Sequence, residues 1–247
     1  MLQTTFLGLF FGTIGTTIGG LIGIISKRNS NKFLSFILSF SSGLMLAVVC
    51  FSLIPEALEI TSVKMVIASM ILGIITMIIC HSLVKNKFNE KTINNGKKAN
   101  VKLLRTGIMV GIGLAIHNIP EGLAIGSGFD ASQTLGFSVA IAICMHDIPE
   151  GLSMALPMKN GGMSALKVMT YVILSGVATG IGALIGAVIG NISLEIIAIC
   201  LSFAAGAMLY IVSGELIPEY NDLYKGRLSS LGNMAGFVIG LIAMIIC

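Results

Sequence analysis

Long apolar windows alternate with short polar stretches along the whole chain. Each window holds about 20 predominantly apolar residues, which as a helix would cross about 30 Å of hydrocarbon. The pattern predicts eight membrane-spanning helices, at residues Phe6–Ile25, Phe33–Ile54, Met65–Val84, Leu103–Gly126, Leu135–Pro157, Val168–Ile189, Leu194–Ile217 and Leu228–Ile246. The expected fold is an all-α integral membrane protein, with residues 1–247 forming a single transmembrane domain.

The composition supports a surface that faces lipid. Charged residues make up 11% of the chain, whereas a soluble domain carries about 25%. The loops are too short for a soluble domain and no G-x-x-x-x-G-K-[ST] is present, so nucleotide hydrolysis and nucleic-acid binding are disfavoured. The chain also lacks the H-E-x-x-H of metalloproteases, and we do not expect an enzyme. Its five cysteines form no C-x-x-C pair, which disfavours a disulfide framework or a thiolate metal site.

Lysine and arginine residues are concentrated in alternate loops of the predicted structure. Of the 15 lysine and arginine residues, 14 fall in the loops after the first, third, fifth and seventh predicted helices, and one, Lys64, falls elsewhere. Because loops rich in lysine and arginine stay cytoplasmic, both termini are predicted to be extracytoplasmic. Residues 85–102 form a basic cytoplasmic loop in this scheme, either a solvated linker or a segment that contacts lipid. His81, just before this loop, is expected to interact with the negative end of its helix dipole.

Two internal repeats run through the sequence. At a shift of 163 residues the first three predicted helices match the last three, and Leu53–Glu56 returns as Leu216–Glu219. An odd number of crossings separates the two starts, so the copies are predicted to be inverted, which is typical of transporters. A second repeat, at a shift of 29, relates the fourth helix to the fifth. The expected architecture is a 3+2+3 arrangement with the fourth and fifth helices as the central pair.

The second repeat carries the most polar sequence inside the apolar windows. His117–Gly122 reads H-N-I-P-E-G and His146–Gly151 reads H-D-I-P-E-G, each near the middle of its helix. Residues three and four apart share a helix face, so each glutamate adjoins the histidine and the asparagine or aspartate of its own motif. The spacing predicts two neighbouring cation positions that share both glutamates. The candidate metal ligands are His117, Asn118, Glu121, His146, Asp147 and Glu150.

These ligands are nitrogen and oxygen donors. Imidazole with carboxylate suits Zn²⁺, Fe²⁺, Mn²⁺ or Co²⁺, whereas Cu⁺ prefers sulfur and Mg²⁺ and Ca²⁺ prefer oxygen. Three carboxylates with neutral histidines carry a charge of −3, and no lysine or arginine is deep enough to balance it. A bound cation, or protons, must therefore balance this charge. A proton relay or a structural hydrogen-bond cluster would use the same residue types.

The two hexapeptides resemble the signature of the ZIP (Zrt/Irt-like) metal transporters, and the I-P-E ends of the second and seventh helices resemble the bacterial GufA/ZupT-type branch. The likeness covers nearly the whole chain. It implies uptake of divalent transition metals toward the cytoplasm and a binuclear centre on the six candidate ligands. Some relatives add a carboxylate from the sixth helix. The sixth helix here has Ser175 and Thr179 as its polar candidates, and Ser175 is taken as a pathway residue.

Other residues are candidates for the path to and from the centre. Met45 and Met208 occupy equivalent places in the second and seventh helices and are either core packing or soft metal contacts. Glu56 ends the second helix outside, and Glu219 ends the seventh helix inside with Glu215 one turn deeper. These acidic residues either lie at solvated helix ends or line the entrance and exit of the pathway, where they concentrate and release cations.

Together these features predict a secondary transporter that moves Zn²⁺, or alternatively Fe²⁺, Mn²⁺, Co²⁺ or Cd²⁺, into the cytoplasm. The other functions left open are a metal/proton antiporter working in efflux and a transporter of protons or monovalent cations. No cofactor is expected besides the transported divalent metal. The expected partners are metal ions and the lipid bilayer of the cell (inner) membrane, with no nucleic acid, and a homodimer is left open.

Overall fold

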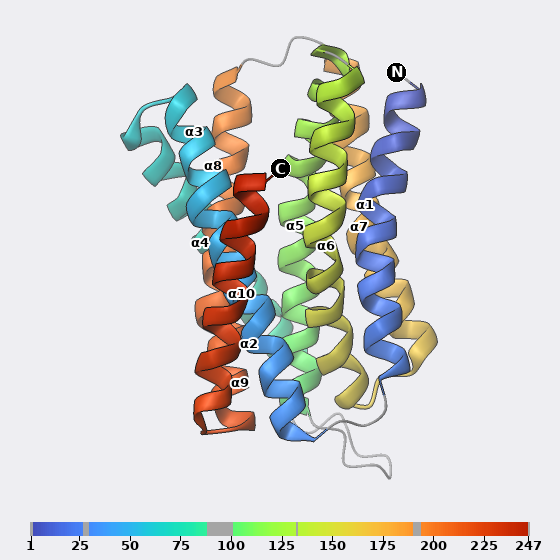
Figure 1. Ribbon diagram of the computed structural model, residues 1–247, viewed down its shortest axis with the longest axis vertical. Helices are drawn as coiled ribbons and strands as arrows, with labels where there is room; N and C mark the ends of the chain where they lie inside the picture. Colours follow the sequence, from blue (N-terminus) through green and yellow to red (C-terminus); the bar gives the residue numbers. More distant parts are fainter. Residues whose placement is uncertain (1, 27–29, 88–100, 132, 190–193, 247) are drawn as a thin grey trace.

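The computed structural model describes residues 2–26, 30–87, 101–131, 133–189 and 194–246. These ranges are helical apart from short connections, which confirms the all-α prediction. The elements are α1 (Leu2–Ile25), α2 (Asn31–Val48), α3 (Ile54–Ile60), α4 (Val63–Lys87), α5 (Val101–Ala131), α6 (Gln133–Asn160), α7 (Ala165–Ile189), α8 (Leu194–Tyr210), α9 (Ile217–Leu223) and α10 (Arg227–Ile246). Figure 1 shows the long helices running along the long axis of the molecule.

Eight helical spans of the described residues are long and apolar enough to cross a membrane. This confirms the number predicted from the apolar windows, and the chain is a multi-pass membrane protein. Several helices run beyond the predicted ends, because a backbone can stay helical after its side chains turn polar. The seventh span, for example, continues from α8 through a π-helical turn at Ile211–Leu216 into α9. The predicted basic loop lies mostly outside the described residues, since its residues 88–100 are not among them.

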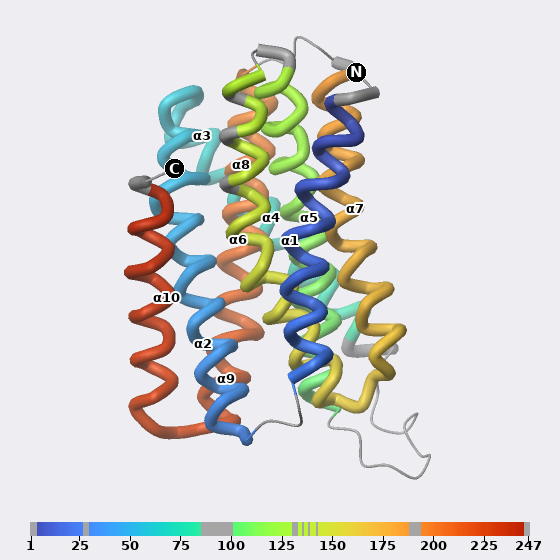
Figure 2. The backbone as a smooth tube through the Cα atoms, turned by 45° about the vertical axis from the view of Figure 1, so that its right-hand side comes forward, coloured from blue at the N-terminus to red at the C-terminus, as the bar shows by residue number. Residues whose placement is uncertain are grey.

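The described helices pack in two sets. α1, α5, α6 and α7 make extensive contacts with one another. In the other set α2 packs on α10, and α4 packs on α8. The short helix α3 prolongs α2 and contacts α8, whereas α9 prolongs α8 and contacts α2. Figure 2 shows α1 and α7 at one side of the molecule and α10 and α2 at the other. α5 also contacts α8 and the π-helical turn after it, so α5 lies where the two sets meet.

Helices that match in sequence at the shift of 163 run in opposite directions in Figure 1, as α1 and α7 show. α2 and α8 are each followed by a π-helical turn that ends two residues before a proline. The turns are Val49–Leu53, before Pro55, and Ile211–Leu216, before Pro218. The two packed sets combine helices from both copies of the repeat. The 3+2+3 arrangement and the single-domain organisation stay predictions.

Glycines bring the helices of the first set close together. A Cβ added to Gly122 of α5 would lie 2.0 Å from the carbonyl oxygen of Thr179 on α7. A Cβ on Gly151 of α6 would lie 2.1 Å from the carbonyl oxygen of Thr16 on α1. Both distances are far below van der Waals contact, so a residue without a side chain is required where these backbones meet. The two glycines end the H-N-I-P-E-G and H-D-I-P-E-G motifs, and they hold the polar part of α5 and α6 against its neighbours.

Candidate metal centre

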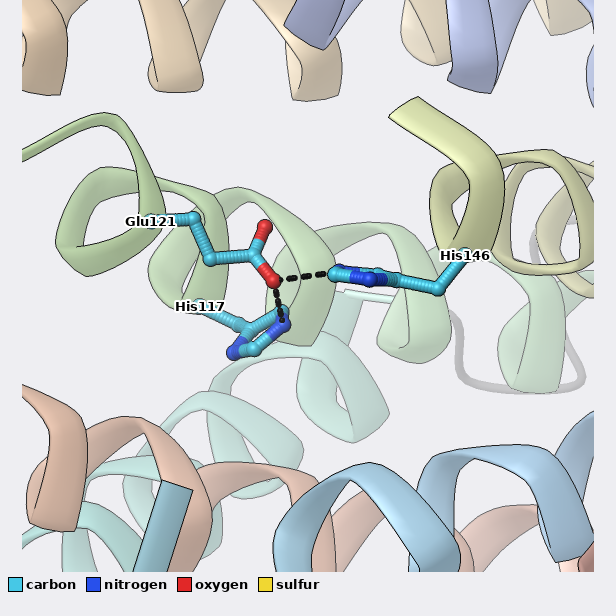
Figure 3. Close-up of side chains that lie close together, drawn as sticks. All are labelled: His117, Glu121 and His146. Atoms are coloured by element: carbon cyan, nitrogen blue, oxygen red, sulfur yellow. Dashed lines mark hydrogen bonds and ion pairs between the residues drawn. The ribbon is translucent and has the colours of Figure 1, made fainter. Parts of the chain in front are cut away.

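Two histidines meet one glutamate between α5 and α6 (Figure 3). Oε1 of Glu121 lies 2.8 Å from Nε2 of His117 and 2.6 Å from Nε2 of His146. One ligand atom from each residue lies within 4.8 Å of the other two. Bonds from zinc to nitrogen and oxygen are about 2.0–2.2 Å long, so small shifts of these atoms would let one cation bind all three. His117 and Glu121 are four residues apart on α5, which explains why a single helix face carries both.

All six candidate ligands are buried. Relative exposure is 9% for His146, 3% for Glu121 and 0% for His117, Asn118, Asp147 and Glu150. Several of their oxygens have no hydrogen-bond partner in the described part of the chain, namely both oxygens of Asp147, Oδ1 of Asn118, Oε2 of Glu121 and Oε2 of Glu150. Buried polar atoms left without partners are unfavourable. A bound cation would satisfy them, so the donor set fits a metal.

The remaining three ligand candidates are less tightly connected. Oε1 of Glu150 lies 3.9 Å from Nε2 of His117. Asn118 donates from Nδ2 to the carbonyl oxygen of Ser175 at 2.9 Å, which ties α5 to α7 and leaves Oδ1 as its acceptor. Asp147 lies close enough to Glu121, His146 and Glu150 to interact with them electrostatically, but its carboxylate makes no hydrogen bond or ion pair with the described residues. The structure therefore brings His117, Glu121 and His146 together, with Glu150 beside them. Among the described residues, Asn118 and Asp147 form no hydrogen bond or ion pair with this group.

With neutral histidines and ionised carboxylates, the centre would carry excess negative charge in the absence of a metal. Among the described residues, neither Glu121 nor Glu150 nor Asp147 is paired with a lysine or an arginine. With both histidines neutral, the three carboxylates carry three negative charges in a region shielded from water. Charges of one sign are stable at such depth when an opposite charge joins them. A divalent transition metal, bound by imidazole and carboxylate, supplies that charge with the preferred donor types.

The other pathway candidates differ in their surroundings. Met45 and Met208 are 1% and 2% exposed and belong to the large apolar core, which favours the packing interpretation. The Ser175 hydroxyl donates to the Val172 carbonyl of its own helix at 2.8 Å, so Ser175 reaches the centre through its backbone oxygen. Glu56 is exposed and accepts a hydrogen bond from Ser52 Oγ at 2.6 Å.

Glu215 and Glu219 are each only 3% exposed, unlike solvated helix ends. Nδ1 of His81, on α4, lies 2.6 Å from Oε1 of Glu215 and 3.0 Å from the Tyr210 hydroxyl. Glu219 accepts a hydrogen bond from the hydroxyl of Thr106, on α5. Sequence analysis missed both contacts and assigned His81 to the helix dipole alone. The available signal was that one histidine and two acidic residues are predicted at the same membrane depth. Residue spacing within one helix does not reveal which other helix its side chains contact.

Comparison with known proteins assigns a family to this arrangement. Residues 86–247 match the family described as ZIP Zinc transporter. The chain is 32% identical to the zinc transporter ZupT of Streptococcus mutans, over 99% of this chain and 98% of that protein. It is 31% identical to the zinc transporter ZupT of Clostridium perfringens, over 98% and 95% of the two chains. It is also 32% identical to the zinc transporter GufA of Myxococcus xanthus, over 95% and 94%.

Proposed function

The chain belongs to the ZIP zinc transporter family, and on that premise we propose that it carries divalent transition-metal ions, Zn²⁺ foremost, across the cell membrane into the cytoplasm. The observation that carries the proposal is the buried meeting of His117 and His146 at the carboxylate of Glu121. These donors suit transition metals better than Mg²⁺ or Ca²⁺. Their position inside a helical membrane protein suits an ion in transit better than a structural ion at a surface.

We assign two cation positions to the centre. The first is formed by His117 and His146 with Glu121 and Glu150. The second uses the same two glutamates with Asn118 and Asp147, whose free oxygens have no other partner in the described residues. Because each glutamate serves both positions, a metal in one position weakens the attraction for a metal in the other. Such mutual repulsion promotes release, which a transporter needs as much as binding.

The path on either side follows from the acidic residues and the charge sorting. Glu56 would collect cations at the outer end, and Glu215 and Glu219 would receive them at the inner end. Ser175 would support the way between through its backbone oxygen, which holds Asn118, whereas Met45 and Met208 belong to the packed core. The orientation, with both termini extracytoplasmic, is taken from the 14 basic residues in alternate loops.

The deciding experiment is metal uptake into proteoliposomes that contain the purified protein. The panel is Zn²⁺, Fe²⁺, Mn²⁺, Co²⁺ and Cd²⁺, with Mg²⁺ as the matched ion of equal charge, each with and without an imposed pH gradient. We expect uptake of the transition metals and none of Mg²⁺. Strict dependence on an opposing proton gradient would favour the antiporter, and proton flux without metal flux would contradict the proposal. The mass of the detergent-solubilised protein would distinguish a monomer from a homodimer.

A further inference from the structure

A second group of polar and charged side chains joins the two sets of helices, far from the metal centre. α5 contributes Lys102 and Thr106 from its first two turns, and α9 contributes Glu219 and Asp222. Nζ of Lys102 lies 3.5 Å from Oε2 of Glu219 and forms an ion pair with Asp222. The Thr106 hydroxyl donates to the same Oε2 of Glu219 at 3.2 Å. Because α5 carries the metal centre and α9 prolongs the other set, these bonds cross the boundary between the sets.

The contact has a buried half and an exposed half. Glu219 and Thr106 are 3% and 2% exposed, so their hydrogen bond is shielded from water. The side chains of Lys102 and Asp222 are 44% and 65% exposed, and an ion pair so accessible to water shifts an equilibrium by about a factor of five at most. A contact of this strength can stabilise one arrangement of the helices and still break in each transport cycle.

A second basic residue of α5 lies near the other inner acid. Arg105, the next residue of α5, is near enough to Glu215 to interact with it electrostatically. Nε of Arg105 is buried and has no hydrogen-bond partner in the described part of the chain. Both inner acids, Glu215 and Glu219, thus have a cationic side chain of α5 beside them. A metal ion that reaches these acids must compete with the cations already there.

At the opposite end of the molecule the described residues form no such contact. The shift of 163 places Ser52 and Glu56 at the positions of Glu215 and Glu219. Glu56 is exposed and accepts a hydrogen bond from Ser52, four residues earlier in the same segment. No ion pair between the two sets is formed at that end by the described residues. The repeat makes the two backbone ends alike, so the difference in bonding comes from the side chains.

We propose that Lys102 and Thr106 of α5, together with Glu219 and Asp222 of α9, form a latch that keeps the inner end of the metal pathway closed and opens once in each transport cycle. A divalent cation arriving at Glu219 replaces the ammonium of Lys102 there, because both bind the same carboxylate. Arrival of the metal therefore favours opening. The inference rests on the proposed function, which supplies the pathway and the cytoplasmic side.

The latch can be held shut through its two exposed residues. In a cysteine-free protein that transports zinc, Lys102→Cys and Asp222→Cys are combined and joined with a short, reducible, thiol-specific cross-linker. We expect the cross-linked protein to retain zinc binding at equilibrium while zinc uptake into proteoliposomes falls at least tenfold, and reduction to restore uptake. Each single cysteine variant is the control, and treatment with the cross-linker should leave its uptake rate as it was before treatment. Undiminished uptake in the cross-linked protein, or failure of the two cysteines to cross-link, would overturn the latch.

Loosening the latch gives a readout that does not depend on transport. Lys102→Gln should raise the hydrogen-exchange rate of backbone amides in α9 and in the first turns of α5 about two- to fivefold. Lys102→Arg should keep the wild-type rate because it retains the charge. The matched control is Lys159→Gln, in the last turn of α6. Equal hydrogen-exchange rates in Lys102→Gln and wild type would contradict the latch. Absence of zinc uptake in every variant, also without the cross-linker, would instead count against the proposed function.

Discussion

Nε2 of His146, on α6, lies 2.6 Å from Oε1 of Glu121, on α5. The contact joins the two copies of the short repeat, so neither helix holds the candidate centre alone. Any change that moves α5 relative to α6 alters the donor set and with it the affinity for metal. The packing of these helices is therefore as much a part of the site as its ligands.

Glu121→Gln is expected to lower zinc uptake roughly 100-fold or more. The amide keeps the shape of the side chain but loses the charge that two histidines and both proposed cations share, and changes to groups around a metal already cost about 10- to 100-fold. Uptake into proteoliposomes and equilibrium dialysis measure the effect. Glu59→Gln, at an exposed position of α3, is the matched control and should behave as wild type. Full activity of Glu121→Gln would rule out the shared site.

Asp147→Asn tests the second cation position. The variant removes a fully buried carboxylate that has no hydrogen-bond partner among the described residues, while the first position keeps its ligands. We expect the number of bound zinc ions to fall from two to one and uptake to slow or change its metal preference. The metal-free protein should unfold at a similar temperature, because the amide has nearly the size of the buried carboxyl group and that group has no hydrogen-bond partner to lose among the described residues. Two zinc ions still bound to Asp147→Asn at wild-type affinity would contradict this assignment.

Gly122→Ala should destabilise the protein by about 1–3 kcal/mol, the usual cost of overpacking. The added Cβ would lie 2.0 Å from the backbone oxygen of Thr179, and α5 and α7 would have to separate. The separation would also strain the hydrogen bond from Asn118 to Ser175. Thermal unfolding in detergent measures the loss. At Gly214 the nearest atom to an added Cβ is 3.5 Å away, so Gly214→Ala should change stability little, and equal effects of the two substitutions would refute the packing argument.

The orientation can be tested with two single cysteines in a cysteine-free protein. Ser62 lies in the connection between α3 and α4, and Lys225 lies between α9 and α10. Both residues are exposed. In intact cells an impermeant maleimide should label Ser62→Cys and leave Lys225→Cys unlabelled until the membrane is permeabilised. The reverse pattern would show that the termini are cytoplasmic.

The sequence by itself determined the features that depend on neighbours along the chain. Apolar windows of bilayer length predicted the eight spans, because a helix in lipid must satisfy its own backbone and present apolar side chains. The four-residue spacing of His117 and Glu121 predicted their contact, because residues at this spacing share a helix face. The ends of the helices were less well predicted, since hydropathy does not report where backbone hydrogen bonding stops.

The tertiary structure decided the contacts between helices. His146 reaches Glu121 across 25 residues, and Thr106 reaches Glu219 across 113. The pairing of His81 with Glu215 was not predicted from the sequence. Such contacts depend on how each helix is rotated about its axis and which helix it packs against. In a membrane these choices follow from close packing of small residues such as Gly122 and from interhelical hydrogen bonds, because lipid is as apolar as the helix surfaces and hydrophobicity alone does not select a partner.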